Sequence, residues 1–251
     1  MNNQRACRWS RREFLGGLTL AGTAGLLGLR PRLGAAEQPP ETSRLRLLQY
    51  PGICFAPQYV AEDLLRGEGF TDVQYMQAAG GAAGAQALAS GEVHFSAQTS
   101  VLLNTRIDAG DPIVFLTGLH VGCFELFGTD RVHTIHDLKG KTVGVTDLGS
   151  GRHLLLASMA AYVGLDPNRD IHFVTYPPVE AIQLFTAGKI DAFMAFPPEP
   201  QELRAQRIGH VVVSTTLDRP WSQYFCCMIA GNREFVRTNP MATKRAVRAL
   251  H

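Results

Sequence analysis

The chain has 251 residues, of which 45% are hydrophobic and 18% are charged, and its formal net charge is +2. The apolar content is sufficient for a packed core. The nearly balanced charge excludes the strong basic field that is typical of nucleic-acid-binding proteins. We therefore expect a globular protein that does not bind nucleic acid.

The N-terminus has the pattern of an export signal. Arg11 and Arg12 precede an uncharged apolar run over residues 16–29, and small residues follow at 34–36. A basic start, an apolar middle and small residues before a cleavage point define such a signal, and the run is shorter than the roughly 20 residues that span a membrane. We expect a twin-arginine-type signal peptide over residues 1–36 and export to the periplasm. A buried or interfacial helix is the alternative.

Strand and helix patterns alternate in the remaining 215 residues (251 − 36). In chain order, we expect strands at 45–50, 72–76, 93–96, 113–118, 142–146, 171–175, 191–196, 210–214 and 224–230. Between them we expect helices at 56–68, 82–90, 101–109, 152–163, 179–187, 199–206 and 241–251, and an irregular stretch through 129. Such alternation indicates an α/β protein whose mainly parallel sheets are flanked by helices.

The chain contains an internal repeat. Residues 86–93 align with residues 183–190 at an offset of 97 (183 − 86), and Gly91 and Gly188 stand at the same place in the two copies. Glycine is common directly after a helix, so each copy indicates a helix, a turn and a strand. Generic likeness between βαβ units is the alternative explanation.

Two similar α/β lobes joined by crossing strands predict a clamshell that binds its ligand at the carboxyl ends of the strands. We predict lobe 1 at 37–128, lobe 2 at 129–220 and an incomplete return to lobe 1 at 221–251.

Four cysteines follow the signal segment. Cys54, Cys123, Cys226 and Cys227 could form disulfides in an oxidising compartment, although nothing in the spacing demands it. Cys226 and Cys227 are adjacent in an expected strand, where neighbouring side chains point to opposite faces. We therefore expect small buried residues that do not share one metal ion or one pocket.

Candidate binding residues lie where the expected strands end. Ser150, Gly151 and Arg152 begin a helix, where amides and a guanidinium could hold an anion, so that Arg152→Ala should abolish its binding and leave the fold intact. Phe196 could stack on a ring, and Glu199 could accept from an amine or complement the helix dipole. The alternatives are capped helix starts and buried structural roles. The full set of candidates is Gly52, Ile53, Phe55, Gln98, Thr99, His120, Ser150, Gly151, Arg152, Phe196, Glu199 and Tyr224.

Signatures of catalysis are missing from the sequence. It has no Gly-x-Ser-x-Gly elbow, no P-loop and no Gly-x-Gly-x-x-Gly after a strand. His133 and His136 stand three residues apart without cysteine or histidine partners nearby. We therefore expect a binding protein with no catalytic residue, no cofactor and no metal site.

Several stretches resemble one known family. They are 56–62 (APQYVAE), 89–95 (ASGEVHF), 135–145 (IHDLKGKTVGV) and 184–193 (LFTAGKIDAF), and the DLKGK stretch is the most specific. They resemble the periplasmic solute-binding proteins of ABC importers of the nitrate/sulfonate/taurine type, which include relatives that bind thiamine-pyrimidine precursors.

The resemblance implies a two-lobed, type II periplasmic-binding-protein fold. It also implies a monomeric receptor that takes a sulfonate, nitrate, carboxylate or heterocycle to a membrane permease and its ATPase. Two alternatives stay open: an exported ligand sensor, and an enzyme similar to the thiamine-pyrimidine synthases, whose cysteine-rich motif the FCCM stretch at 225–228 does not match. The family usually continues beyond the helix that Asn239 and Pro240 begin, so we expect a C-terminally truncated chain.

Overall fold

A computed structural model describes residues 37–50 and 52–251, and the predicted signal peptide lies outside this range. The fold below is that of the compact unit Pro39–His251. Within the part of the chain that is described, no helix combines the length and the apolarity needed to cross a bilayer.

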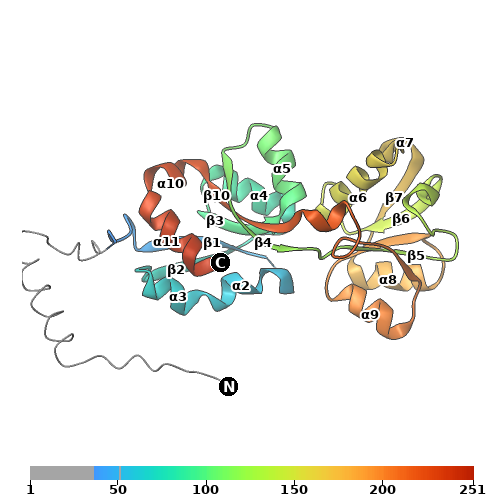
Figure 1. Cartoon of the computed structure of the whole chain (residues 1–251), viewed down its shortest axis with the longest axis horizontal. Helices are drawn as coiled ribbons and strands as arrows, with labels where there is room; N and C mark the ends of the chain where they lie inside the picture. The colour runs from blue at the N-terminus through green and yellow to red at the C-terminus, as the bar shows by residue number, and fades with distance from the viewer. Residues whose placement is uncertain (1–36, 51) are drawn as a thin grey trace, which may run out of the picture. The chain divides into compact units, whose positions relative to one another are not determined.

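The first sheet, sheet A, has the strand order β2-β1-β3-β10-β4. β1 is parallel to β2 and β3, whereas β10 is antiparallel to both β3 and β4. Its strands, shown in Figure 1, are β1 (Arg44–Gln49), β2 (Asp72–Gln77), β3 (Phe95–Thr99), β4 (Ile113–Val121) and β10 (Phe225–Asn232).

The second sheet, sheet B, has the order β7-β6-β8-β5-β9. β6 is parallel to β7 and β8, and β5 is antiparallel to both β8 and β9. Its strands are β5 (Glu125–Gly128), β6 (Lys141–Val145), β7 (Ile171–Thr175), β8 (Ala192–Ala195) and β9 (His210–Ser214).

The two sheets repeat one topology. β1 and β6 begin at residues 44 and 141, β3 and β8 at 95 and 192, and β4 and β9 at 113 and 210, so that the offset is 97 in each case. Each sheet has one antiparallel strand, and the chain enters that strand directly from the other sheet. β5 in sheet B follows β4 of sheet A, and β10 in sheet A follows β9 of sheet B. The predicted pair of α/β lobes is confirmed, and each sheet is mixed because the crossing strand runs against its neighbours.

Helices pack on both sheets. α4 and α5 contact strands of sheet A, and α6 and α8 contact strands of sheet B. The helices and 3-10 turns are η1 (Ile53–Phe55), α2 (Ala56–Val60), α3 (Glu62–Gly67), α4 (Gly81–Ser90), α5 (Ser100–Asp108), η2 (Ile135–Leu138), α6 (Gly151–Tyr162), α7 (Pro167–Asp170), α8 (Pro178–Thr186), α9 (Glu199–Gln206), η3 (Trp221–Gln223), α10 (Arg233–Thr238) and α11 (Pro240–Leu250).

Both faces of the central strands are buried. Leu47 and Leu48 are adjacent in β1 and belong to two different core clusters. In β8 the same holds for Phe193 and Met194. A strand that is covered on both faces reads as a continuous apolar run, which is why the sequence located these strands.

The passage from sheet A to sheet B corrects two expectations. The chain leaves sheet A after Val121 and enters sheet B at Glu125, so residues 125–128, which the sequence analysis placed in lobe 1 and in an irregular stretch, pair in the second sheet. Gly122 makes the turn with φ 78°, and a Cβ there would lie 2.2 Å from Thr216 Oγ1.

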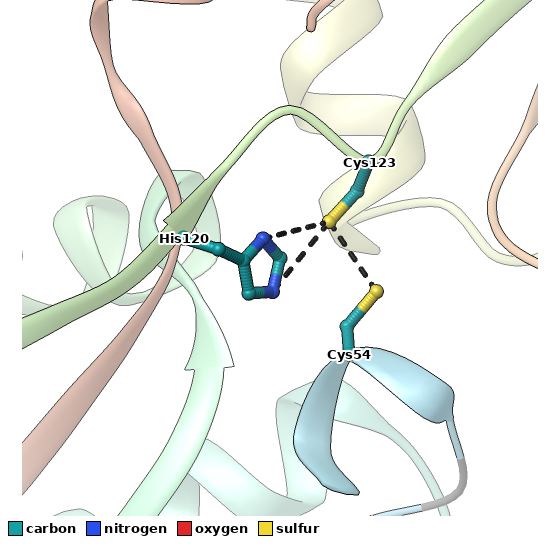
Figure 2. A group of neighbouring side chains, drawn as sticks. All are labelled: Cys54, His120 and Cys123. Carbon is teal, nitrogen blue, oxygen red and sulfur yellow. Dashed lines mark hydrogen bonds between the residues drawn. The ribbon is translucent and has the colours of Figure 1, made fainter. Parts of the chain in front are cut away.

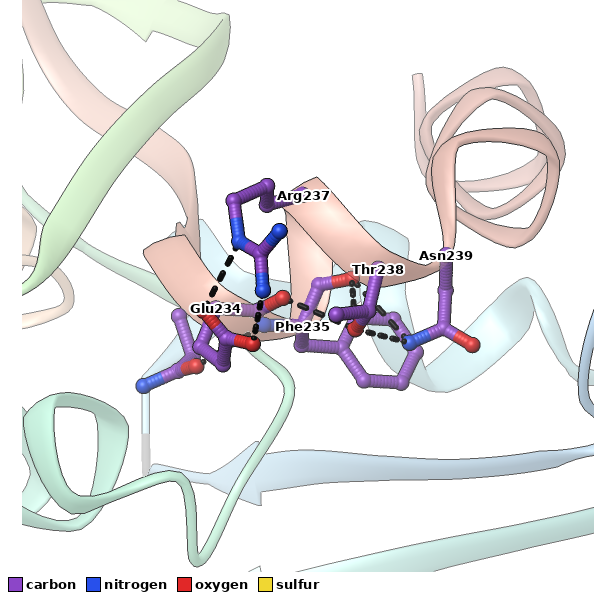
Figure 3. A network of polar contacts seen from close by, with 6 residues as sticks. Glu234, Phe235, Arg237, Thr238 and Asn239 are labelled. Atoms are coloured by element: carbon purple, nitrogen blue, oxygen red, sulfur yellow. Dashed lines mark hydrogen bonds and ion pairs between the residues drawn. The ribbon is translucent and has the colours of Figure 1, made fainter.

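The end of β10 leads into two short helices (Figure 3). The Asn232 side chain accepts from the Phe235 amide at 3.0 Å and donates to the Leu88 carbonyl at 3.0 Å, which fastens the start of α10 to α4. Thr238 Oγ1 donates to the Glu234 carbonyl, and Asn239 Nδ2 donates to the Phe235 carbonyl. These side chains satisfy carbonyls that the end of α10 leaves open.

Candidate functional site

A pocket of about 640 Å³ lies where the carboxyl ends of the parallel strands of both sheets meet the first residues of α4, α5, α6, α8 and α9. Both lobes contribute to its wall. The lining residues are Tyr50, Gly52, Phe55, Ala78, Ala79, Gly80, Gly81, Gln98, Thr99, Leu102, Phe124, Thr146, Asp147, Ser150, Gly151, Arg152, Thr175, Tyr176, Pro177, Pro178, Phe196, Pro197, Pro198 and Glu199.

Most of the predicted binding residues line this pocket. They are Gly52, Phe55, Gln98, Thr99, Ser150, Gly151, Arg152, Phe196 and Glu199. The prediction found them because parallel strands with equivalent connections present their carboxyl ends along one edge.

Three predicted residues do not line the pocket. Ile53 begins η1 and Tyr224 precedes β10, and both side chains are exposed to solvent, at 71% and 64%. His120 lies at the end of β4, where its ring contacts the Cys123 sulfur at 3.5 Å.

Other lining residues were missed. Tyr50 and Asp147 each follow a strand by one or two residues, so the rule that found Gly52 and Ser150 would have found them as well. Leu102 lies in the first turn of α5. Phe124 falls in the stretch that the sequence left irregular, and only the crossing between the sheets brings its ring to 5.1 Å from that of Phe196.

Arg152 and Glu199 form a buried fork-like pair at the pocket wall. Arg152 Nη2 donates to Glu199 Oε1 at 2.8 Å, and Nη1 donates to Oε2 and to the Met194 carbonyl. Their side chains are 13% and 9% exposed. Glu199 also accepts from the Phe196 amide at 2.9 Å.

This arrangement differs from the predicted roles of both residues. The Arg152 charge is offset by a carboxylate within the protein, and its guanidinium lies over the Phe193 and Phe196 rings at 5.9 and 5.7 Å. Glu199 binds Arg152 rather than only complementing a helix dipole. The pair therefore orients the wall that carries Phe196 and brings little net charge to a ligand.

Backbone amides supply the donors of the pocket. The first amides of a helix have no intrahelical acceptor, and α4 and α5 begin without a side-chain cap. Ser150 caps α6 by accepting from the His153 amide at 3.4 Å. In contrast, proline occupies the first turns of α8 and α9 and removes donors there. The backbone hydrogen-bond donors of the pocket therefore lie at the starts of α4, α5 and α6.

Tyr50 stands beside these amides. Burial raises the pKa of its phenol, an effect that the Asp147 carboxylate reinforces and that Arg152 and a hydrogen bond from the Gly81 amide oppose. The hydroxyl therefore stays protonated at neutral pH and can donate to a ligand. Its ring meets Phe55 edge to face, with the centroids 5.3 Å apart.

The comparisons with known proteins agree with this fold. The alkanesulfonate-binding protein SsuA from Xanthomonas axonopodis pv. citri matches with a TM-score of 0.64 and 19% identity, over 84% of this chain and 72% of that one. The periplasmic nitrate-binding protein NrtA from Synechocystis PCC 6803 matches with a TM-score of 0.65 and 18% identity, over 85% and 61%.

Similarity in sequence extends to a curated protein and to a family. The nitrate import ATP-binding protein NrtC of Synechocystis sp. is 29% identical over 133 residues, which are 49% of this chain and 20% of NrtC. The chain thus spans about a fifth of the length of this relative. The resemblance to the nitrate/sulfonate type of binding protein is confirmed. Because the profile of the NMT1-like family matches residues 38–251 as one stretch, the chain belongs to the NMT1-like family.

Proposed function

We propose that the chain is the ligand-binding component of an ABC-type importer and that it binds a small organic solute between its two lobes. The observation that carries this proposal is the pocket of about 640 Å³ at the strand ends of both sheets. Its volume falls within the roughly 300–1,000 Å³ that is usual for small-molecule sites. The named binding proteins of the same fold support the assignment.

The lining favours a ligand with two different ends. Aromatic rings and prolines, among them Phe55, Phe196 and Pro198, offer apolar walls. The amides at the starts of α4, α5 and α6 favour a hydrogen-bond acceptor such as a sulfonate, a carboxylate or a carbonyl. The lining offers a bare inorganic anion no unpaired guanidinium, because that of Arg152 is already paired with Glu199. We therefore propose a ring-bearing or apolar organic molecule with a polar acceptor end.

Binding without turnover is part of the proposal. Among the described residues that line the pocket there is no histidine, the side chain that most often acts as a general base, and the Glu199 carboxylate is paired with Arg152. In the full proposal the protein is exported through its N-terminal signal, acts as a monomer in the periplasm and delivers the ligand to a permease and its ATPase.

A thermal-shift screen tests this function. Sulfonates, nitrate, carboxylates, pyrimidines and amines would each be added to the full chain, with chromatography to detect conversion. A ligand at 100 times its dissociation constant stabilises the folded state by about 2.7 kcal/mol, which raises the melting temperature by a few degrees. We expect a shift from one organic class, with the compound recovered unchanged.

Two glycine variants make the screen specific for the pocket. A Cβ at Gly80 or at Gly67 meets no atom within 4 Å, and neither residue needs a positive φ. Gly80 lines the pocket, so Gly80→Trp should fill it and remove the shift, whereas Gly67→Trp, in α3, should keep it. An equal shift in both variants would contradict the pocket, and conversion of the compound would support an enzyme instead.

A further inference from the structure

Four cysteines and one histidine gather beside the crossing between the sheets, although they come from three distant segments. Cys54 belongs to η1, His120 is the last residue but one of β4, Cys123 lies between β4 and β5, and Cys226 and Cys227 are in β10. Figure 2 shows Cys54, His120 and Cys123 pointing toward one another. The pocket lining includes none of the five residues.

The ligand atoms of this cluster are close together. The Cys54 and Cys123 sulfurs are 3.4 Å apart, and the Cys226 and Cys227 sulfurs are 3.7 Å apart. Cys123 Sγ lies 3.5 and 3.8 Å from the two His120 nitrogens. Two overlapping groups, which share Cys123, each keep their ligand atoms within 4.8 Å: Cys54 with His120 and Cys123, and Cys123 with Cys226 and Cys227.

The closeness of Cys226 and Cys227 overturns the expectation that they face opposite ways. The pairing of β10 with β4 shifts its register between Phe225 and Cys227 and again between Cys227 and Met228. Such a bulge re-aims side chains that would alternate in a regular strand. It sets Cys227 opposite His120 and leaves the Cys226 sulfur on the same side.

The backbone at Cys123 is held in a strained conformation. Its φ is 111°, a region that residues with a Cβ rarely adopt. Strain of this kind persists where the surrounding structure imposes it and is often associated with a functional site. Here it turns the Cys123 sulfur toward Cys54 and His120.

We propose that the cluster of Cys54, His120, Cys123, Cys226 and Cys227 binds one thiophilic metal ion, with Zn²⁺ as the reference ion and four of the five side chains as its ligands. A tetrahedral Zn²⁺ with Zn–S bonds of about 2.3 Å separates its sulfur ligands by about 3.8 Å. The sulfur pairs at 3.4 and 3.7 Å approach this spacing. Thiolate and imidazole ligands select zinc or Cu(I) over magnesium and calcium.

A pair of disulfides is the competing state of four such cysteines. A disulfide brings its sulfurs to about 2.05 Å, whereas all four cysteines are free thiols at longer separations. Each thiol that binds the ion would release its proton to solvent.

The ion would brace the connections between the lobes. Cys54 stands between Gly52 and Phe55, and Cys123 precedes Phe124, so two of its ligands neighbour pocket-lining residues. It would join η1, the β4–β5 crossing and β10, the strand that returns from the other lobe. Since its ligands lie outside the pocket, this site is independent of the proposed function.

Cobalt substitution tests the site directly. The full chain, reduced and kept free of oxygen, would be titrated with Co²⁺ and then with Zn²⁺. We expect one equivalent of Co²⁺ to give thiolate-to-cobalt charge-transfer absorption together with the visible bands of a tetrahedral ion, and Zn²⁺ to displace both. Zn²⁺ should also protect the thiols from a thiol-specific reagent. Wild-type protein without the charge-transfer band would overturn the proposal.

Single substitutions locate the ion. Cys227→Ser and the half-buried Cys54→Ser should each weaken Zn²⁺ binding by about tenfold or more, with circular dichroism to verify folding. Cys7→Ser changes the remaining cysteine, which lies outside the described residues, and should bind Zn²⁺ as wild type does. Gly80→Trp should also keep Zn²⁺ binding, which separates this site from the ligand pocket. Unchanged affinity in both cluster variants would contradict the site, as would an equal loss in Cys7→Ser.

Discussion

Arg152 and Glu199 are the most deeply buried charged side chains in the pocket wall, and each stabilises the fold only while it is paired with the other. A guanidinium and a carboxylate with 13% and 9% exposure have lost most of their hydration. Their mutual hydrogen bonds and the Phe196 amide replace it. Removing one partner of such a pair leaves a buried charge without compensation, which costs about 3–5 kcal/mol.

We therefore predict that Arg152→Ala lowers the free energy of unfolding by about 3 kcal/mol or more in urea titrations. This replaces the expectation from sequence that the fold would stay intact. The double variant Arg152→Met with Glu199→Gln removes both charges and keeps an acceptor for the Phe196 amide, so it should recover more than half of the loss. The exposed pair of Arg237 and Glu234 is the control, and Arg237→Ala should leave the urea midpoint unchanged. Wild-type stability in Arg152→Ala would contradict the pairing argument.

The site was predictable where it depends on strand ends and not where it depends on irregular backbone. Gly52, Ser150 and Phe196 follow strands that the apolar pattern located. In contrast, the grouping of Cys226 with Cys227 depends on a bulge, and the orientation of Cys123 depends on a positive φ. Neither feature leaves a periodic signal in the sequence.

At the scale of the elements, the first amides of α11 donate hydrogen bonds to the carboxylate of Glu41, which lies far away in the sequence. The Met241 and Ala242 amides donate to Glu41 Oε1 and Oε2 at 2.9 and 2.8 Å. Asn239, at the N-cap position, makes no side-chain cap. Glu41 thus satisfies two of the open amides and places a negative charge at the positive end of the helix dipole.

We predict that Glu41→Ala destabilises the protein by about 0.5–1 kcal/mol at pH 7. Burial raises the pKa of Glu41, but hydrogen bonds from the Met241 and Ala242 amides outweigh it, so the folded pKa lies below its ordinary value. A depressed carboxyl pKa contributes stability that is present above the unfolded pKa and is lost as the pH falls through the folded one. The difference in melting temperature between wild type and variant should therefore shrink on acidification below about pH 4.5.

The exposed Glu92, which precedes β3, is the control for this prediction, and Glu92→Ala should melt as wild type does. A difference between wild type and Glu41→Ala that stays constant from pH 7 to pH 3 would show that the carboxylate charge is not what stabilises α11.

Element length and apolar pattern together decided what the sequence could predict. β1 and α6 were placed within one residue of their bounds, because each carries apolar residues at the period of its element. β5 (ELFG) and α10 (REFVRT) are short and mix polar with apolar residues, and both were missed. β8 is as short as β5, but all four of its residues are apolar, and it was located. The predicted helix at 56–68 is two helices, because the chain breaks regular hydrogen bonding at Ala61.

At the scale of the whole fold, two connections link the sheets, residues 122–124 and residues 215–224. The repeat at an offset of 97 was enough to predict two lobes, because each copy contributes the same strands in the same order. What it could not indicate was how near the lobes come. α5 and α6 are in contact, and a Cβ at Gly151 would lie 2.5 Å from Thr99 Oγ1.

Gly151 therefore offers a way to test closure of the lobes around a ligand. We predict that saturating ligand lowers the radius of gyration of the wild-type protein in solution scattering, because binding shifts the population toward the closed form. Gly151→Val adds side-chain atoms where α6 meets Thr99 and should hold the lobes apart. The variant should then compact less, and each tenfold loss of the closed population raises its apparent dissociation constant tenfold.

Gly67→Val is the matched control, since a side chain there meets no atom within 4 Å. It should show the wild-type affinity and the wild-type compaction. Identical scattering with and without ligand in wild-type protein would contradict closure. If Gly151→Val bound weakly but compacted as wild type does, the glycine would instead serve the ligand directly, by letting it approach the α6 amides. The two readouts together therefore separate a role of Gly151 in the approach of the lobes from a role in contact with the ligand.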